Sequence, residues 1–70
     1  METIQAEKVR KVTRFGNQFD ITVKGETHRV TTDGLPFGLP RDATGGAKIT
    51  LDSSDEVLVW WTTSQVEVGE

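Results

Sequence analysis

The chain has 70 residues, a net charge of −3 and no cysteine. A chain of this length makes one domain that buries about 60% of its unfolded surface, so residues 1–70 are expected to form a single small β domain. The missing cysteines exclude disulfides and thiolate metal sites, and a pI near 5.0 disfavours a nucleic-acid partner.

The N-terminal residues, the lack of a long apolar run and the charge distribution narrow the class of protein further. Residues 1–4 lack the basic and apolar regions of a signal peptide, and no apolar run approaches the roughly 20 residues of a membrane-spanning helix. We therefore expect a cytoplasmic protein without membrane contact. Residues 1–32 carry six basic and four acidic side chains, and residues 33–70 carry two basic and seven acidic ones, so a charge of +2 is followed by −5.

Residues 3–12 allow two interpretations. Alternating polarity predicts an edge strand, bulged near Lys8 and Val9, whereas several good helix formers after Thr3 leave a short helix as the alternative. A tight turn at Gly16-Asn17 would place Val12 opposite Ile21 in the next strand. The same turn would place two arginines on the apolar face, with Arg10 opposite Val23 and Arg14 opposite Phe19.

Residues 19–32 read as a hairpin. A two-residue turn at Gly25-Glu26, with glycine first, would be of type II′ and would place Ile21 opposite Val30. One face then collects Phe19, Ile21, Val23, His28 and Val30. The other face is polar and includes a diagonal pair of Asp20 with Arg29.

Residues 33–46 connect this hairpin to the next one. The segment is rich in glycine and proline, which predicts irregular backbone. A connection of this length is either a structural lid or a binding loop. We expect Leu35, Phe37 and Leu39 to pack against one end of the domain, with a backbone more mobile than the strands.

Residues 47–61 form a second hairpin around a polar loop at residues 52–56. Its register would place Leu51 opposite Val57 and Ala47 opposite Trp61, on one apolar face. Leu58 and Trp60 then point to the reverse face, which needs a cover. A sixth short strand from residues 65–68, a second copy of the chain or a ligand would each provide one.

A three-strand meander, a long connection and a hairpin give an all-β fold. We expect a small barrel of five to six strands with OB-like order, and an SH3-like barrel is the second choice. No catalytic, metal or cofactor motif stands out. His28 is the only histidine and is expected to be a partly buried, hydrogen-bonded structural residue, because no partner set for zinc exists.

The sequence therefore favours a non-enzymatic protein-binding module that self-associates or belongs to a larger assembly. Exposed aromatic and aliphatic side chains are typical anchors of such interfaces, and the candidates are Trp60, Leu58, Phe37, Leu35 and Leu39. The alternative is a single-stranded nucleic-acid binder of OB-like fold. Its candidate contacts are Lys8, Arg10, Lys11, Arg14 and Phe15.

Overall fold

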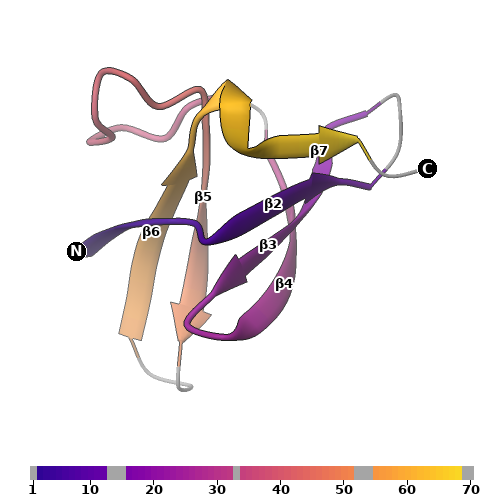
Figure 1. The fold of residues 1–70 in the computed structure, drawn as a ribbon. Coiled ribbons are helices and arrows are strands. Elements are labelled where there is room, and N and C mark those ends of the chain that lie inside the picture. Colours follow the sequence, from indigo (N-terminus) through magenta and orange to yellow (C-terminus); the bar gives the residue numbers. More distant parts are fainter. Residues whose placement is uncertain (1, 13–15, 33, 52–54, 69–70) are drawn as a thin grey trace.

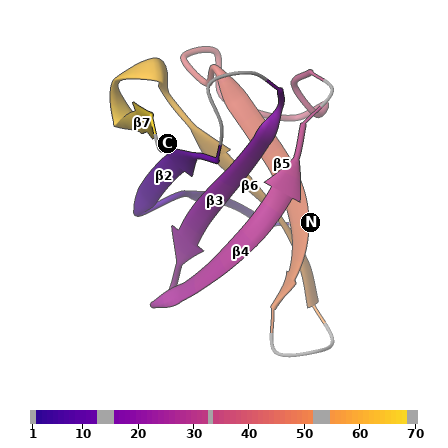
Figure 2. The ribbon, with the colours of Figure 1, turned by 90° about the vertical axis from the view of Figure 1, so that its right-hand side faces the viewer.

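The computed structural model describes residues 2–12, 16–32, 34–51 and 55–68, and these residues form two packed β-sheets (Figures 1 and 2). The three-stranded sheet has the order β1-β6-β5 and the four-stranded sheet the order β4-β3-β2-β7. The strands are β1 (Glu2–Gln5), β2 (Lys8–Lys11), β3 (Gln18–Val23), β4 (Glu26–Thr31), β5 (Gly45–Leu51), β6 (Asp55–Trp61) and β7 (Val66–Val68), with a 3₁₀ turn η1 (Thr63–Gln65) before β7.

The all-β expectation is confirmed, but within the described residues no ladder closes the two sheets into a barrel. β4 and β5 are the edge strands that face each other where such a barrel would close. None of the described helical segments is long and apolar enough to span a membrane.

The chain passes from one sheet to the other at Ala6 and Glu7. The Ala6 amide donates to the Trp60 carbonyl in the three-stranded sheet at 2.8 Å, and the next amide, of Glu7, donates to the Thr22 carbonyl in the four-stranded sheet at 2.8 Å. The switch therefore lies just before Lys8, and residues 3–12 form two short strands on either side of it instead of a helix.

The expected register of the first hairpin strand is wrong. Val9, not Val12, lies opposite Ile21, and Arg10 lies opposite Asp20. The shift is odd, so it exchanges the two faces of the strand. Val9 becomes fully buried and Arg10 becomes exposed, which removes the arginine that the Gly16-Asn17 turn placed on the apolar face. The expected position of Arg14 lies outside the described residues.

The second turn also differs from the expectation, but its faces are right. Lys24 and Gly25 both have positive φ, 52° and 80°, so they are the central residues of a type I′ turn. Ile21 therefore lies opposite His28 and not Val30. Because the register moves by two residues, every side chain keeps its predicted face, and Ile21, Val23 and Val30 are buried.

The β5–β6 hairpin shows the same two-residue shift. Ala47 pairs with Val59, Gly45 pairs with Trp61, and Leu51 pairs with Asp55. Asp55 and Glu56, which were expected in the loop, belong to β6, and residues 52–54 lie outside the described part. β1 adds to the other side of β6 in parallel, so β6 is the central strand of its sheet.

The core lies between the sheets and centres on Trp61. This side chain is 2% exposed, and its ring centroid lies 5.3 Å from that of Phe19 on the opposite sheet. Trp61 faces Gly45 across the β5–β6 ladder. A Cβ at Gly45 would overlap the Trp61 indole, so the ring occupies the space that a side chain there would fill.

The Gln65 side chain links the tail by hydrogen bonds to Ala6, where the chain passes from one sheet to the other. Its Nε2 donates to the Ala6 carbonyl at 2.9 Å, and its Oε1 accepts from the Thr62 amide at 3.0 Å and from Nε2 of Gln5 at 2.9 Å. β7 then pairs in parallel with β2. The tail does form an extra strand, which is the edge strand of the four-stranded sheet beside β2.

Replacing Gly45 and Gly46 by alanine should have unequal effects. In Gly45→Ala the new methyl group must displace the buried Trp61 ring, an overpacking that costs about 1–3 kcal/mol. In Gly46→Ala the nearest atom is Cδ1 of Leu39 at 2.5 Å, the free end of a half-buried side chain that moves more easily. Urea unfolding followed by Trp fluorescence measures both losses, and equal losses would contradict the Trp61 argument.

Gln65→Glu should lower the free energy of unfolding by about 1–3 kcal/mol, because the carboxylate cannot donate to the Ala6 carbonyl. Gln18→Glu makes the same chemical change at an exposed position and should leave the stability within about 0.5 kcal/mol of the parent. Thermal and urea unfolding of both variants test this. Similar losses in both would mean that added charge, and not the lost hydrogen bond, is responsible.

Candidate functional site

The most distinctive surface feature is the open seam between β4 and β5. We define the seam as residues 27–32 and 46–50. Among the described residues no backbone hydrogen bond joins the two strands, although both are edges of their sheets. Figure 2 shows β4 running at an angle to β5, so that the end of β4 nearest the β3–β4 turn lies farther from β5 than its other end.

The unpaired backbone groups of β4 can be assigned from its pairing with β3. The Thr32 amide donates to the Asn17 carbonyl at 2.9 Å, and hydrogen-bonded pairs alternate along an antiparallel ladder. The even-numbered residues of β4 therefore bond to β3. The amides and carbonyls of Thr27, Arg29 and Thr31 point the other way, into the seam.

The same reasoning applies to β5. The Trp60 carbonyl accepts from Ala6 in the β1 direction, and the Trp61 carbonyl accepts from Thr44 on the β5 side at 2.8 Å. Odd-numbered residues of β6 thus bond to their odd-numbered partners in β5. Gly46, Lys48 and Thr50 are left with backbone groups that point into the seam from its other side.

An open groove of about 740 Å³ follows the seam and continues under the start of the connection at Gly34 and Pro36. Its apolar floor comes from Val30, Ala47 and Ile49, which are buried. The polar residues of the lining are mainly threonines and basic residues. The described residues of the lining, none of them acidic, are Thr27, His28, Arg29, Val30, Thr31, Thr32, Gly34, Pro36, Gly46, Ala47, Lys48, Ile49 and Thr50.

His28 is partly buried in this wall, as expected, but it is not a satisfied structural residue. Its Nε2 is buried and has no hydrogen-bond partner among the described residues. A buried polar atom without a partner costs about 1–3 kcal/mol. His28 therefore lines the groove, while its Nε2 is shielded and lowers the stability of the fold.

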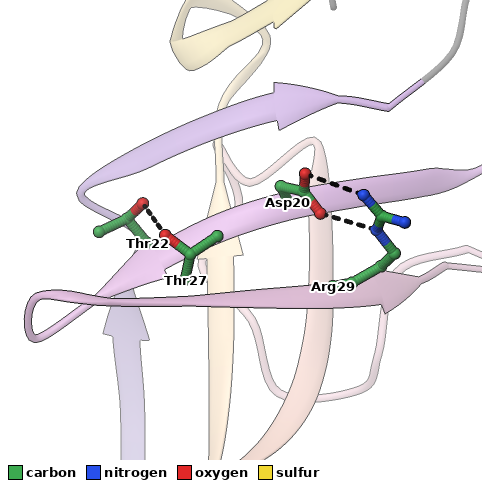
Figure 3. Close-up of polar contacts among 4 residues, drawn as sticks. All are labelled: Asp20, Thr22, Thr27 and Arg29. Atoms are coloured by element: carbon green, nitrogen blue, oxygen red, sulfur yellow. Dashed lines mark hydrogen bonds and ion pairs between the residues drawn. The ribbon is translucent and has the colours of Figure 1, made fainter.

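The outer face of the four-stranded sheet carries the predicted ion pair (Figure 3). Arg29 lies directly opposite Asp20, not on the diagonal, and its Nε donates to Oδ1 of Asp20 at 3.0 Å. This hydrogen bond, with the positive charges of Arg29 and Arg10, holds the pKa of Asp20 below its ordinary value. Beside it, the hydroxyls of Thr22 and Thr27 lie 3.4 Å apart. Arg29 is thus oriented at the rim of the seam.

The connection does not pack as expected. Leu35 and Phe37 are exposed, and Phe37 is exposed completely. Leu39 and Pro36 lie over Gly46, on the face of the three-stranded sheet that points away from the core, and Figure 1 shows the connection on that side of β5 and β6. The tip with Leu35 and Phe37 therefore stands beside the end of the groove that Gly34 and Pro36 line.

Leu58 and Trp60 point to the reverse face, away from the core that holds Trp61, as the alternation predicts. Leu58 is nevertheless only 3% exposed, between its register neighbours Thr3 and Lys48. Trp60 is half-buried and lies in register with Gly46, on which Leu39 packs. Leu58 therefore offers almost no surface, and Trp60 offers part of its ring.

The basic residues of the first strand divide between two faces. Lys8 and Arg10 lie on the outer face of β2, beside a hollow of about 180 Å³ that Asp20 also lines. Lys11 projects to the other face, in register with Phe19. The register places Arg10 between Asp20 and Glu67, so acidic groups flank it. Arg14 and Phe15 lie outside the described residues.

Sequence reasoning missed the seam because it depends on how the two sheets meet. The amphipathic pattern predicts which side of β4 and β5 faces inward, but it carries no information on whether their edges pair. One weak signal existed. Two glycines at the start of β5 allow the connection to lie close over the strand, which draws residues 34–44 to the outer face.

His28→Phe should raise the free energy of unfolding by about 1 kcal/mol, because it removes the unpaired Nε2 and retains a ring of similar shape. Urea unfolding measures the change. A loss of stability would show that solvent or another group satisfies Nε2 in solution.

Comparison with known proteins gives no relative. No protein-family model matches the chain, no curated protein is similar to it, and no solved structure matches it.

Proposed function

We propose that this chain is a non-enzymatic protein-binding module that docks its partner along the β4–β5 seam and the adjoining tip of the connection. The observation that carries the proposal is the combination of unpaired strand edges on both sides of a groove with an exposed apolar tip at its end. Unpaired edges bind extended segments through main-chain hydrogen bonds.

The exposed tip supports this function. Leu35 and Phe37 are the two large hydrophobic side chains that the described part of the chain leaves exposed. An exposed phenylalanine next to a groove is well placed to fill a pocket on a partner, and large aromatic anchors contribute most of the energy of many interfaces. Phe37 and Leu35 are therefore the anchor residues of the proposal. Leu39, which packs on Gly46, and the half-buried Trp60, in register with Gly46, are secondary candidates.

The absence of a ladder between β4 and β5 among the described residues fits the same proposal. We propose that the two sheets are the halves of a small barrel left open at the seam. Around the core, consecutive strands are neighbours, from β2 through β3 and β4 to β5 and β6. This chain-order arrangement favours the SH3-like alternative over OB-like order, in which the strands follow a Greek key.

The test is selection from a displayed library of random peptides, with the double variant Leu35→Ser/Phe37→Ser beside the parent. Peptides that bind the parent should lose about 2 kcal/mol or more of binding energy to the variant. Its stability should remain near that of the parent, because both side chains are exposed. Isothermal calorimetry measures affinity and thermal unfolding measures stability.

Lys8→Ser/Arg10→Ser is the matched control, because it changes two exposed residues on a different surface. The control should bind the selected peptides as the parent does. Peptides that still bind the Leu35→Ser/Phe37→Ser variant but no longer bind the Lys8→Ser/Arg10→Ser variant would contradict the proposed surface. A single-stranded oligonucleotide that binds through Lys8 and Arg10 would instead support the nucleic-acid alternative.

A further inference from the structure

We propose that the seam binds an extended segment of a partner protein as an added β-strand, and that this segment alternates apolar with acidic side chains. The inference rests on the proposed function and specifies its ligand. It follows from the direction of the unpaired backbone groups, the apolar floor and the charge of the groove.

The backbone of the seam is suited to an added strand. Thr27, Arg29 and Thr31 on β4 direct amides and carbonyls into the groove, and these groups recur at every second residue. An extended peptide presents its own amides and carbonyls with the same period of two. Main-chain pairing therefore supplies affinity along about five residues of β4, without requiring a particular side chain.

The two faces of the added strand would meet different surroundings. Side chains that point inward reach the floor formed by Val30, Ala47 and Ile49, which favours aliphatic residues. Side chains that point outward lie between the outer faces of the two sheets, where Arg29 and Lys48 are exposed. Successive residues of a strand alternate between these sides, so the fitting segment alternates as well.

Charge selects acidic residues for the outward positions. The chain as a whole has a net charge of −3, yet the charged or titratable residues that line the groove, among those that the structure describes, are Arg29, Lys48 and His28. Arg29 already binds Asp20 through one edge of its guanidinium group. Within the described residues Lys48 forms no ion pair, so it is the better free cation for a carboxylate of the partner.

The experiment titrates ¹⁵N-labelled protein with a capped nine-residue peptide of alternating valine and glutamate. Two matched peptides accompany it, one with lysine in place of glutamate and one with the glutamate peptide N-methylated at every residue, so that neither edge can donate. The glutamate peptide should bind, and it should slow amide hydrogen exchange at Thr27, Arg29 and Thr31. The lysine and N-methylated peptides should bind at least about fivefold more weakly, because one lacks the charge pairing and the other the main-chain donors.

Two variants locate the binding. Lys48→Glu should weaken the glutamate peptide about fivefold or more, and Lys8→Glu, which makes the same charge change on the outer face of β2, should not. Equal weakening by both variants would show long-range attraction without a seam site and would overturn the inference. So would equal affinity for the N-methylated peptide, since a strand cannot then be forming.

The remaining outcomes separate this inference from the proposed function. If the alternating peptide does not bind but library peptides still require Leu35 and Phe37, the acidic strand is wrong and the binding module stands. If neither class binds, both proposals fail. Protection of the seam amides that rises with protein concentration alone, or with a single-stranded oligonucleotide, would assign the seam to a second copy or to nucleic acid and would overturn the inference.

Discussion

The packing of Trp61 between the sheets is the contact on which the rest of the structure depends. Its ring lies against Phe19 of the other sheet and occupies the space that a side chain at Gly45 would need. Burying one ring of this size provides a large share of the apolar area available to so short a chain. Because adjacent strand residues point to opposite sides, the inward position of Trp61 also directs Trp60 outward.

The chain switch at Ala6 explains why the molecule is open on one side. Consecutive amides there bond to different sheets, and Gln65 binds the Ala6 carbonyl from the tail. The two sheets are thus joined by continuous backbone and hydrogen bonds at this corner. No described residue makes an equivalent link between β4 and β5, so the seam is the side on which the sheets are free to diverge.

The sequence predicted which residues face the core more reliably than which residues pair. Ile21, Val23 and Val59 are buried as expected, although both hairpins are shifted by two residues, because a shift of two preserves the faces. The prediction for β2 was wrong because its register shift is odd, which exchanges the two faces of the strand. There the pattern was ambiguous, with arginines and valines at mixed spacing, and the decisive constraint was the sheet switch, which involves residues more than 50 positions away in sequence.

The same distinction applies to the candidate site. Phe37 was a candidate contact from the sequence, but it was expected to pack against the domain, and its complete exposure was not predicted. The seam was not predicted from the sequence, because it is a property of two strands that do not pair.

An unpaired strand edge is a hazard for a soluble protein, since it templates pairing with other chains. In this chain the exposed charges of Arg29 and Lys48 lie along the two edges, where like charges discourage pairing between identical copies. Pairing β4 with β5 directly would satisfy their backbone groups within one chain. Because these groups stay unpaired, a domain near the lower size limit lacks that stabilisation. The unpaired Nε2 of His28 lowers its stability further. Local features that lower the stability of a fold concentrate at functional sites, and here both lie in the same groove.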